Sequence, residues 1–157
     1  VKQLLKFEAQ KNVIVAFSLN PEEIINSIEE KTPKLEKRLK ALKQVAEHGY
    51  PVGLRFDPLI YCQDYKRLYS ELMESITSLN IPAQQIHSIS IGTLRFPEKM
   101  HKKIHNLYPK SALLNQQGYQ DNKIISYPPK IDEEIKEFML STVKDAFHDV
   151  AIFSCNS

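Results

Sequence analysis

The stretch YPVGLRFD, residues 50–57, decides the fold class of this chain. Every second residue in it is apolar, and the residues between are small or charged; the apolar set is Val52, Leu54 and Phe56. A period of two is typical of a β-strand, because successive side chains of a strand point to opposite faces of a sheet. The strand ends near Arg55 and Asp57, so we expect charged groups where the chain leaves the sheet.

Helix signals stand on both sides of this strand. Upstream, Thr32-Pro33 begins a helix that Gly49 ends, and its apolar residues recur on one face: Leu35, Leu39, Leu42, Val45 and Ala46. Downstream, residues 63–79 predict a helix with a buried stripe of Tyr65, Leu68, Leu72 and Ile76. A helix, a strand and a second helix therefore follow one another along the chain.

The same order extends towards the N-terminus. Residues 12–18 are an apolar, β-branched run of the kind found in a sheet that is covered on both faces. Asn20-Pro21 then opens a helix, with Asn20 placed to cap it and Glu23 placed to complete a capping box. This segment is a second strand that leads directly into a helix.

The order also extends towards the C-terminus. Residues 86–92 predict a third strand, and Pro97 opens the helix after it. A polar stretch from 109 to 129 interrupts the pattern before a last helix from Ile131 and a terminal strand at 150–154. Alternating strands and helices indicate the α/β class, with a parallel sheet that is doubly wound or curved into a barrel.

Three parallel strands cannot close a barrel, and they leave two unpaired edges. We therefore expect the chain to be incomplete and to associate with itself through those edges. Both α/β architectures place function at the carboxyl ends of their strands. Those ends carry a set of polar and aromatic residues: Ser18, Asn20, Arg55, Asp57, Tyr61, Thr93, Arg95 and Phe96.

Composition excludes few functions. The chain has 157 residues, 42% of them hydrophobic, which suffices for one folded unit, and its net charge of +2 fits nucleic-acid and small-molecule partners alike. No apolar run approaches the roughly 20 residues of a membrane span, and no signal-peptide pattern begins the chain, so we expect a cytoplasmic protein. Cys62 and Cys155 lack companions at ligand spacing, so neither a disulfide framework nor a metal site is indicated.

Four segments carry a family resemblance: AFSLNP at 16–21, KTPKLEKRL at 31–39, HGYPVGLRFDP at 48–58 and GTLRFP at 92–97. In order and spacing they resemble the spore photoproduct lyase family of radical S-adenosylmethionine enzymes. The resemblance implies that residues 1–108 are the C-terminal half of a partial (β/α)6 TIM-like barrel. Residues 109–157 would then form an extension of a hairpin, a helix and a short strand.

The same resemblance implies cofactors that this stretch cannot hold alone. The family's three-cysteine motif, which binds a [4Fe–4S] cluster, lies upstream and has no counterpart in these residues. That cluster binds S-adenosylmethionine and supplies the electron that cleaves it. We expect the complete protein to be a lyase that repairs DNA photoproducts, and this fragment alone to bind neither cofactor and to be inactive. The alternative is a noncatalytic α/β module from a truncated or split gene that self-associates or binds nucleic acid weakly.

Four residues are expected in or near the cofactor pocket. Ser18 and Asn20 match a Ser-x-Asn pattern, which implies hydrogen bonds to S-adenosylmethionine, although Asn20 also fits a helix cap. Arg55 and Asp57 share one face of their strand and would either orient the cofactor and substrate or form an internal ion pair.

Four further residues are predicted to contact DNA. Arg95 matches an Arg-Phe pair with Phe96 and would bind a phosphate; the alternative is a surface Arg with Phe96 packed under the next helix. Tyr61 is expected at the rim. Tyr119 lies in a hairpin predicted over 118–127, where Tyr119-Gln120 replaces the Arg-Tyr pair expected from the family. A basic cluster on the helix that Pro97 opens either tracks a nucleic-acid backbone or is a solvated face: Lys99, His101, Lys102, Lys103, His105 and Lys110.

Overall fold

The computed structural model describes residues 1–29, 31–109 and 118–155. Its main sheet has four parallel strands in the order β1-β2-β3-β7. Their bounds are β1 (Val15–Ser18), β2 (Val52–Leu59), β3 (Ile86–Thr93) and β7 (Ala151–Ser154). The α/β class and its parallel sheet are confirmed, and the terminal strand, which was predicted without a position in the sheet, pairs with β3 as the fourth member.

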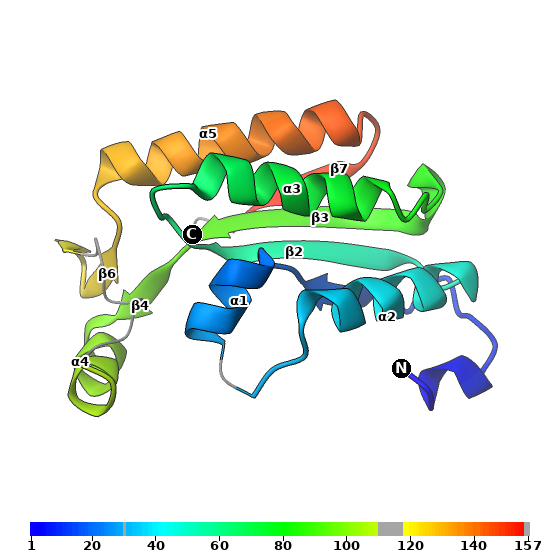
Figure 1. The fold of residues 1–157 in the computed structure, drawn as a ribbon, viewed down its shortest axis with the longest axis horizontal. Helices are drawn as coiled ribbons and strands as arrows, with labels where there is room; N and C mark the ends of the chain where they lie inside the picture. Colours follow the sequence, from blue (N-terminus) through cyan, green and yellow to red (C-terminus); the bar gives the residue numbers. More distant parts are fainter. Residues whose placement is uncertain (30, 110–117, 156–157) are drawn as a thin grey trace.

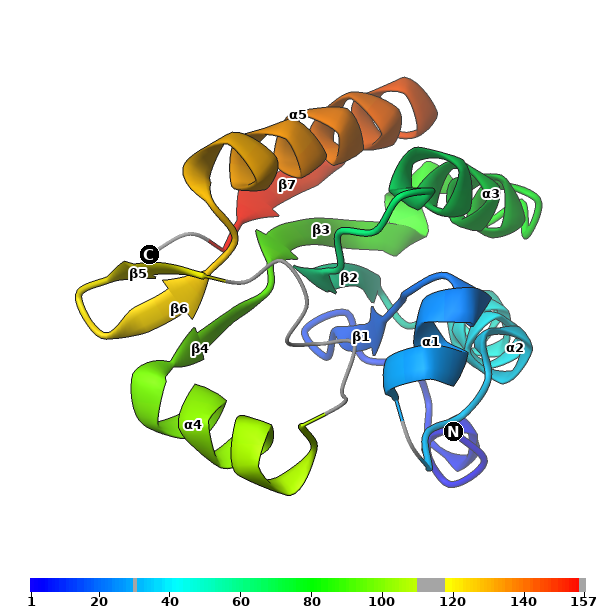
Figure 2. The same cartoon turned by 60° about the vertical axis from the view of Figure 1, so that its left-hand side comes forward.

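Four helices cover one face of this sheet (Figures 1 and 2). They are α1 (Glu22–Ile28), α2 (Leu35–Glu47), α3 (Tyr65–Thr77) and α5 (Pro129–Ala146). The core lies between these helices and the sheet, where Val52, Leu54 and Phe56 are fully buried. The predicted stripe of α3 is also buried, together with Tyr69 and Met73. Burial of these apolar side chains is the main force that holds the helices on the sheet.

The other face of the sheet, called here the open face, has no helix over it in the described part of the chain (Figure 2). Strand alternation and register place one large apolar residue on it, Phe153, and otherwise small or polar ones: Ala16, Ser18, Gly53, Arg55, Asp57, Ser88, Ser90, Gly92 and Ala151. The prediction that residues 12–18 form a strand covered on both faces was therefore wrong. The strand begins only at Val15, and its side chains alternate between half-buried and exposed because one face is open.

A smaller antiparallel sheet continues from the carboxyl end of β3. It consists of β4 (Arg95–Pro97), β6 (Ile124–Ser126) and β5 (Tyr119–Asp121), and α4 (Glu98–Leu107) packs beside it. The predicted hairpin is confirmed: β5 and β6 pair across a turn in which Asn122 and Lys123 have φ values of 45° and 67°. Both positive values fit the tight turns that join antiparallel strands.

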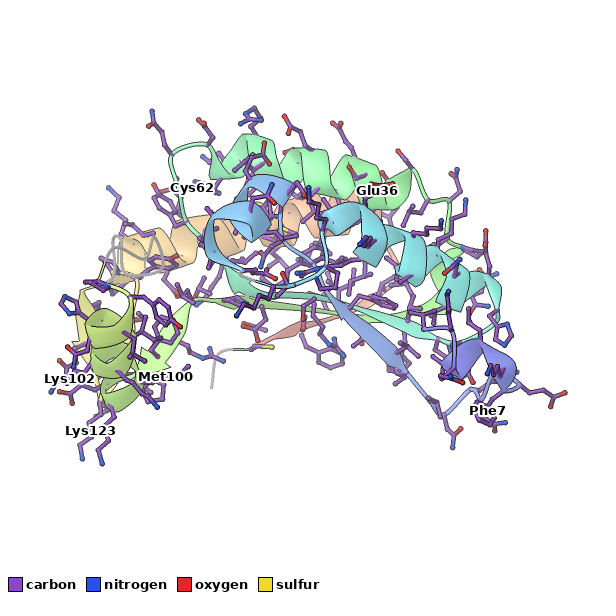
Figure 3. All side chains as sticks on the ribbon, turned by 60° about the horizontal axis from the view of Figure 1, so that its bottom comes forward. Phe7, Glu36, Cys62, Met100, Lys102 and Lys123 are labelled. Atoms are coloured by element: carbon purple, nitrogen blue, oxygen red, sulfur yellow. The ribbon has the colours of Figure 1, made fainter. Side chains whose placement is uncertain are left out.

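The outlying unit of α4 and the hairpin projects from the main body (Figure 3), where Met100, Lys102 and Lys123 extend into solvent. Met100 and Leu107 are 51% and 61% exposed, while Ile104 packs against the core.

Two short 3-10 helices, η1 (Leu4–Lys6) and η2 (Ala83–Gln85), complete the described elements. Among the described residues, no helix combines the length and the apolar character that crossing a bilayer requires.

Asn20 does not cap α1. The helix begins after Pro21, which makes no side-chain cap hydrogen bond, and the predicted capping box with Glu23 is absent from the hydrogen bonds of the described residues. Instead, the carboxylate of Glu22 accepts the backbone N–H of Leu35 at 2.7 Å, at the first turn of α2. The Asn20 side chain bonds to residues that are distant in sequence and therefore does not cap α1. The first turn of α1 supports the start of α2.

Candidate functional site

The carboxyl ends of β1, β2 and β3 meet at one edge of the main sheet, as the parallel topology requires. Ser18 lies in register with Arg55, and Arg55 lies in register with Ser90. The backbone carbonyl of Ser18 accepts a hydrogen bond from Arg38 Nη1 at 3.0 Å. Two predicted cofactor residues, Ser18 and Arg55, are therefore neighbours on the open face, and α2 holds the end of β1 in place.

Asn20 belongs to a buried polar network behind this edge. It is 6% exposed; its Nδ2 donates to Glu29 Oε1 at 3.2 Å, and its Oδ1 accepts from the Tyr69 hydroxyl at 3.1 Å. Glu29 also forms an ion pair with Arg38. Burial favours the neutral acid, but hydrogen bonds from Arg38 and Asn20 outweigh it and lower the pKa of Glu29. Both ends of the Asn20 amide are thus engaged within the protein.

Two tyrosine hydroxyls fix the loop that follows β2. Tyr69 accepts the backbone N–H of Ile60 at 2.8 Å, and Tyr127 accepts that of Tyr61 at 3.0 Å. The Tyr61 ring lies 4.9 Å from the Tyr65 ring and 6.2 Å from the Tyr127 ring. Burial raises the pKa of Tyr127 to about 12, so its hydroxyl stays neutral. Half-buried Tyr61 therefore stands in an aromatic cluster that joins the loop to the hairpin.

Arg55 and Asp57 lie flat on the open face, each over a glycine. A Cβ at Gly53 would stand 3.2 Å from Arg55 Nη2, and a Cβ at Gly92 would stand 2.8 Å from Asp57 Oδ1. Arg55 Nη1 donates to Ser88 Oγ at 3.3 Å. No ion pair within 4.0 Å joins Arg55 and Asp57, so the internal ion pair that the sequence left open is not formed. The two charges are held separately on one surface.

A groove of about 450 Å³ lies between the hairpin and the start of α5. Its walls carry polar, charged and aromatic groups, among them Thr93, Arg95, Tyr119, Asp121, Asp132 and Lys136. Asp132 accepts a hydrogen bond from Thr93 and pairs with Lys136. Arg95 is exposed and Tyr119 is 42% exposed, so both are available to a ligand in the groove. Two of the four predicted DNA-contacting residues are brought together here.

Phe96 does not share this location. It is 8% exposed, its ring centroid is 6.4 Å from that of His101 on α4, and it does not line the groove. The sequence alternative, in which Phe96 packs under the following helix, agrees with the structure, and a substrate contact by Phe96 stays a prediction. On the same helix Lys102 pairs with Glu98 at 2.6 Å, and Lys110 lies outside the described residues.

Sequence reasoning missed four residues that shape the site: Arg38, Tyr69, Ser90 and Tyr127. Arg38 lies within the KTPKLEKRL segment, and the alternation HSISIG at 87–92 already indicated a polar strand face that includes Ser90. Tyr69 and Tyr127 gave no local signal, because their hydroxyls bond to backbone groups that are 9 and 66 residues away in sequence.

Parallel β/α units covered on one side, with polar groups on the other side and at the strand ends, define an α/β protein of the kind whose sites lie at carboxyl strand ends. The family model described as spore photoproduct lyase matches residues 1–154. The chain belongs to the spore photoproduct lyase family.

Curated relatives and solved structures of the same family are similar to this chain. A spore photoproduct lyase of Clostridium acetobutylicum is 24% identical over 97% of this chain and 47% of its own length, and that of Bacillus subtilis is 30% identical over 62% and 29%. A solved spore photoproduct lyase complexed with dinucleoside spore photoproduct has a TM-score of 0.79 at 22% identity, covering 98% of this chain and 48% of its own. A variant with bound AdoMet and the same dinucleoside has a TM-score of 0.77 at 21% identity, covering 90% and 44%.

These two solved structures share the fold of the chain. The chain spans about half the length of the first relative it matches and a smaller share of the second.

Proposed function

We propose that this chain supplies one wall of an S-adenosylmethionine-dependent lyase that repairs a thymine-derived photoproduct in DNA. The observation that carries the proposal is the continuity of the open face with the groove. Ser18, Arg55 and Asp57 on the sheet are followed, at the same edge, by Arg95 and Tyr119. A cofactor on the sheet and a nucleic acid in the groove would then lie side by side.

The one-sided sheet supports the architecture we propose. Residues 1–108 would be the C-terminal half of a partial (β/α)6 barrel with the open face turned inwards, and residues 109–157 would be an extension that reaches the DNA. Helices on one face only, and unpaired outer edges on β1 and β7 among the described strands, are what a section of a barrel requires. A family relative with bound AdoMet and dinucleoside spore photoproduct gives the ligand classes.

The residues of this chain fit S-adenosylmethionine better than they fit an iron–sulfur cluster. Arg55 and Ser18 offer a cation and a hydroxyl to the anionic and polar parts of the cofactor. No group of three or more His, Cys, Asp or Glu side chains in the described ranges could hold a metal ion. We therefore propose that cysteines elsewhere in the complete protein hold the [4Fe–4S] cluster, which supplies the electron for cleavage, and that this chain is inactive alone.

The roles proposed for the chain's own residues are binding and orientation. Ser18, Arg55 and Asp57 would orient the cofactor, and Asn20 would hold their strand end rather than reach the ligand, because both ends of its amide are occupied. Arg95 would bind a DNA phosphate, and Tyr119 would lie against a base. Tyr61 would line the rim between the two ligands.

Substitution of Arg95 tests the groove. We expect Arg95→Ala in the complete protein to weaken DNA binding and to reduce the slope of log K against log salt by about 1, since one phosphate contact is lost. Fluorescence anisotropy at several salt concentrations measures both quantities. Lys43→Ala on α2 is the matched control, since Lys43 is exposed and does not line the groove. Unchanged affinity of Arg95→Ala at low salt would refute the assignment.

The complete protein tests the enzyme. Anaerobic reconstitution with iron and sulfide should give iron–sulfur absorbance. Addition of a chemical reductant such as dithionite should then give reductive cleavage of S-adenosylmethionine to methionine and 5′-deoxyadenosine. If neither the absorbance nor the cleavage is observed, the proposed lyase function is wrong, and the second candidate, a noncatalytic self-associating module, is favoured. The unpaired outer edges of β1 and β7, within the part of the sheet that is described, are the observation that favours that module.

A further inference from the structure

The guanidinium of Arg55 has hydrogen-bond donors that no group in the described residues uses. The side chain is half-buried on the open face, and among the described residues its guanidinium donates one side-chain hydrogen bond, to Ser88 Oγ at 3.3 Å. It forms no ion pair with any described carboxylate. A guanidinium has five N–H donors, so most of its donor capacity is unused within the described structure.

Gly53 leaves room for the guanidinium in this position. An added Cβ at Gly53 would stand 3.2 Å from Nη2 and 3.4 Å from Cζ of Arg55, which is closer than ordinary van der Waals contact allows without movement. The guanidinium therefore rests against the sheet itself. Such a position limits the rotamers of Arg55 before any ligand binds, and preorganisation of this kind lowers the entropic cost of binding.

Ser90 gives a second and independent indication of a missing ligand. It is 5% exposed, and its Oγ is the buried side-chain oxygen without a hydrogen-bond partner in the described structure. It lies directly beside Arg55 in the register of β2 and β3. The guanidinium of Arg55 itself reaches back to Ser88, the residue two positions before Ser90 on the same face of β3. Because buried hydroxyls are nearly always hydrogen-bonded in folded proteins, an unpaired one on the same face as this underused guanidinium indicates an acceptor that the two groups could share.

We propose that Arg55 and Ser90 form an oxyanion-binding site on the open face, which takes a carboxylate or a phosphate oxygen. Arg55 donates charge-assisted hydrogen bonds to the oxyanion, and the Ser90 hydroxyl donates one more. The site deepens the proposed function, on which it rests for the identity of the ligand: the carboxylate of S-adenosylmethionine is the oxyanion expected there.

Asp57 determines which anions the site prefers. Its carboxylate lies on the same face, two residues further along β2, and is exposed. It repels a second negative charge and attracts a cation placed beside the first anion. The site therefore favours a zwitterionic group, such as an amino-acid end with its ammonium, over a phosphate dianion.

Nuclear magnetic resonance of the complete protein, ¹⁵N-labelled and without its iron, tests the site directly, because this chain alone is expected to bind neither cofactor. The reporters are the Arg55 Nε–H and Ser90 amide signals, followed during titration with three probes at millimolar concentration. S-adenosylmethionine carries the carboxylate and the ammonium, 5′-methylthioadenosine lacks both, and inorganic phosphate carries the oxyanion alone. We expect the first and third probes to shift both reporters, and methylthioadenosine to leave the Arg55 signal unchanged.

Variants separate binding from folding. Arg55→Leu should weaken S-adenosylmethionine binding at least about tenfold, and Arg55→Lys should restore part of it, as expected for a lost charge-assisted contact. Ser90→Ala should weaken binding by a smaller factor while leaving the melting temperature equal or higher, since it removes an unpaired buried hydroxyl. Asp57→Asn should strengthen phosphate binding and weaken S-adenosylmethionine binding. Arg67→Leu, at an exposed position of α3, is the matched control.

The outcomes distinguish the two proposals. If phosphate shifts both reporters and S-adenosylmethionine does not, the oxyanion site stands and the proposed cofactor fails. A different result is that S-adenosylmethionine shifts signals of other residues only, and that Arg55→Leu binds it as tightly as the unchanged protein. The proposed cofactor is then supported and the oxyanion site is overturned. If neither reporter signal shifts with any of the three probes, the oxyanion site is also overturned.

Discussion

Arg38 makes contacts that connect three segments of the chain. Its guanidinium donates to the carbonyl oxygens of Pro33 and Ser18 at 2.9 and 3.0 Å and pairs with Glu29. Only 12% of the side chain is exposed, and its ion pair with Glu29 is part-buried. At the scale of single residues, one arginine holds the end of β1, the turn before α2 and the end of α1.

We expect Arg38→Leu to lower the free energy of unfolding by about 2–4 kcal/mol, because it leaves a half-buried carboxylate and two carbonyls without their donor. Urea unfolding followed by circular dichroism measures the change. Arg67→Leu removes an exposed i,i+4 pair with Glu71 and should cost less than about 1 kcal/mol. Equal costs for the two variants would contradict a structural role for the Arg38 network.

The lowered pKa of Glu29 makes stability depend on pH. Since the folded protein favours the ionised carboxylate more than the unfolded chain does, this stabilisation is present above the unfolded pKa, near 4.5, and is lost as pH falls through the folded pKa. We expect the free energy of unfolding to decrease as the pH drops below about 5. Urea titrations at several pH values measure this; the decrease should be smaller in Glu29→Gln, and an identical pH profile would rule Glu29 out as a source.

At the scale of elements, β2 and β3 are shaped to carry charged side chains flat against the sheet. The Asp57 carboxylate and the Cβ of Cys155 lie 2.8 and 3.0 Å from the position that a Cβ at Gly92 would occupy. A glycine inside a strand normally weakens it, so its presence in β3 has a steric explanation here.

We expect Gly92→Ala to destabilise the chain by about 1–3 kcal/mol through this overlap, and Asp57→Ala to recover part of the loss. A double-mutant cycle measured by thermal or urea unfolding gives the coupling energy between the two positions. Additive effects would show that the Asp57 carboxylate does not occupy the space above Gly92.

At the scale of the whole molecule, both outer strands of the described main sheet have an unpaired edge, β1 on one side and β7 on the other. Exposed apolar side chains accompany both edges: Val13 and Ile14 before β1, each 41% exposed, and Phe153 in β7, 54% exposed. Unprotected edges of this kind pair with other strands, which natural proteins prevent by charge, by bulges or by covering the edge.

We therefore expect this chain, when isolated, to self-associate through its sheet edges. Light scattering coupled to size-exclusion chromatography should show a mass that rises with concentration, and Ile14→Lys or Phe153→Lys should reduce it. Glu36→Lys, at an exposed position of α2 and therefore outside both outer strands, is the control. A monomer at all concentrations would contradict the expectation.

The family, the alternation of strands and helices, and the polar strand ends could all be predicted from the residues in order. The alternation of Val52, Leu54 and Phe56 correctly predicted which side of β2 is buried. The stripe of α3 was equally clear, because residues that share a helix face are only three or four positions apart. The cap assigned to Asn20 failed because its amide met partners from α3 and from the end of α1.

The sequence by itself determined most of the elements, the buried faces of β2 and α3, and the family, because these depend on neighbours within a few residues and on short motifs. Only the tertiary structure decided that Phe96 is buried and that Arg95 and Tyr119 share a groove. It also decided that Arg55 stands beside an unpaired Ser90 without an acidic partner in the described residues. Those facts depend on residues that are 24 to 35 positions apart in the chain, and local periodicity carries no information about such distant contacts.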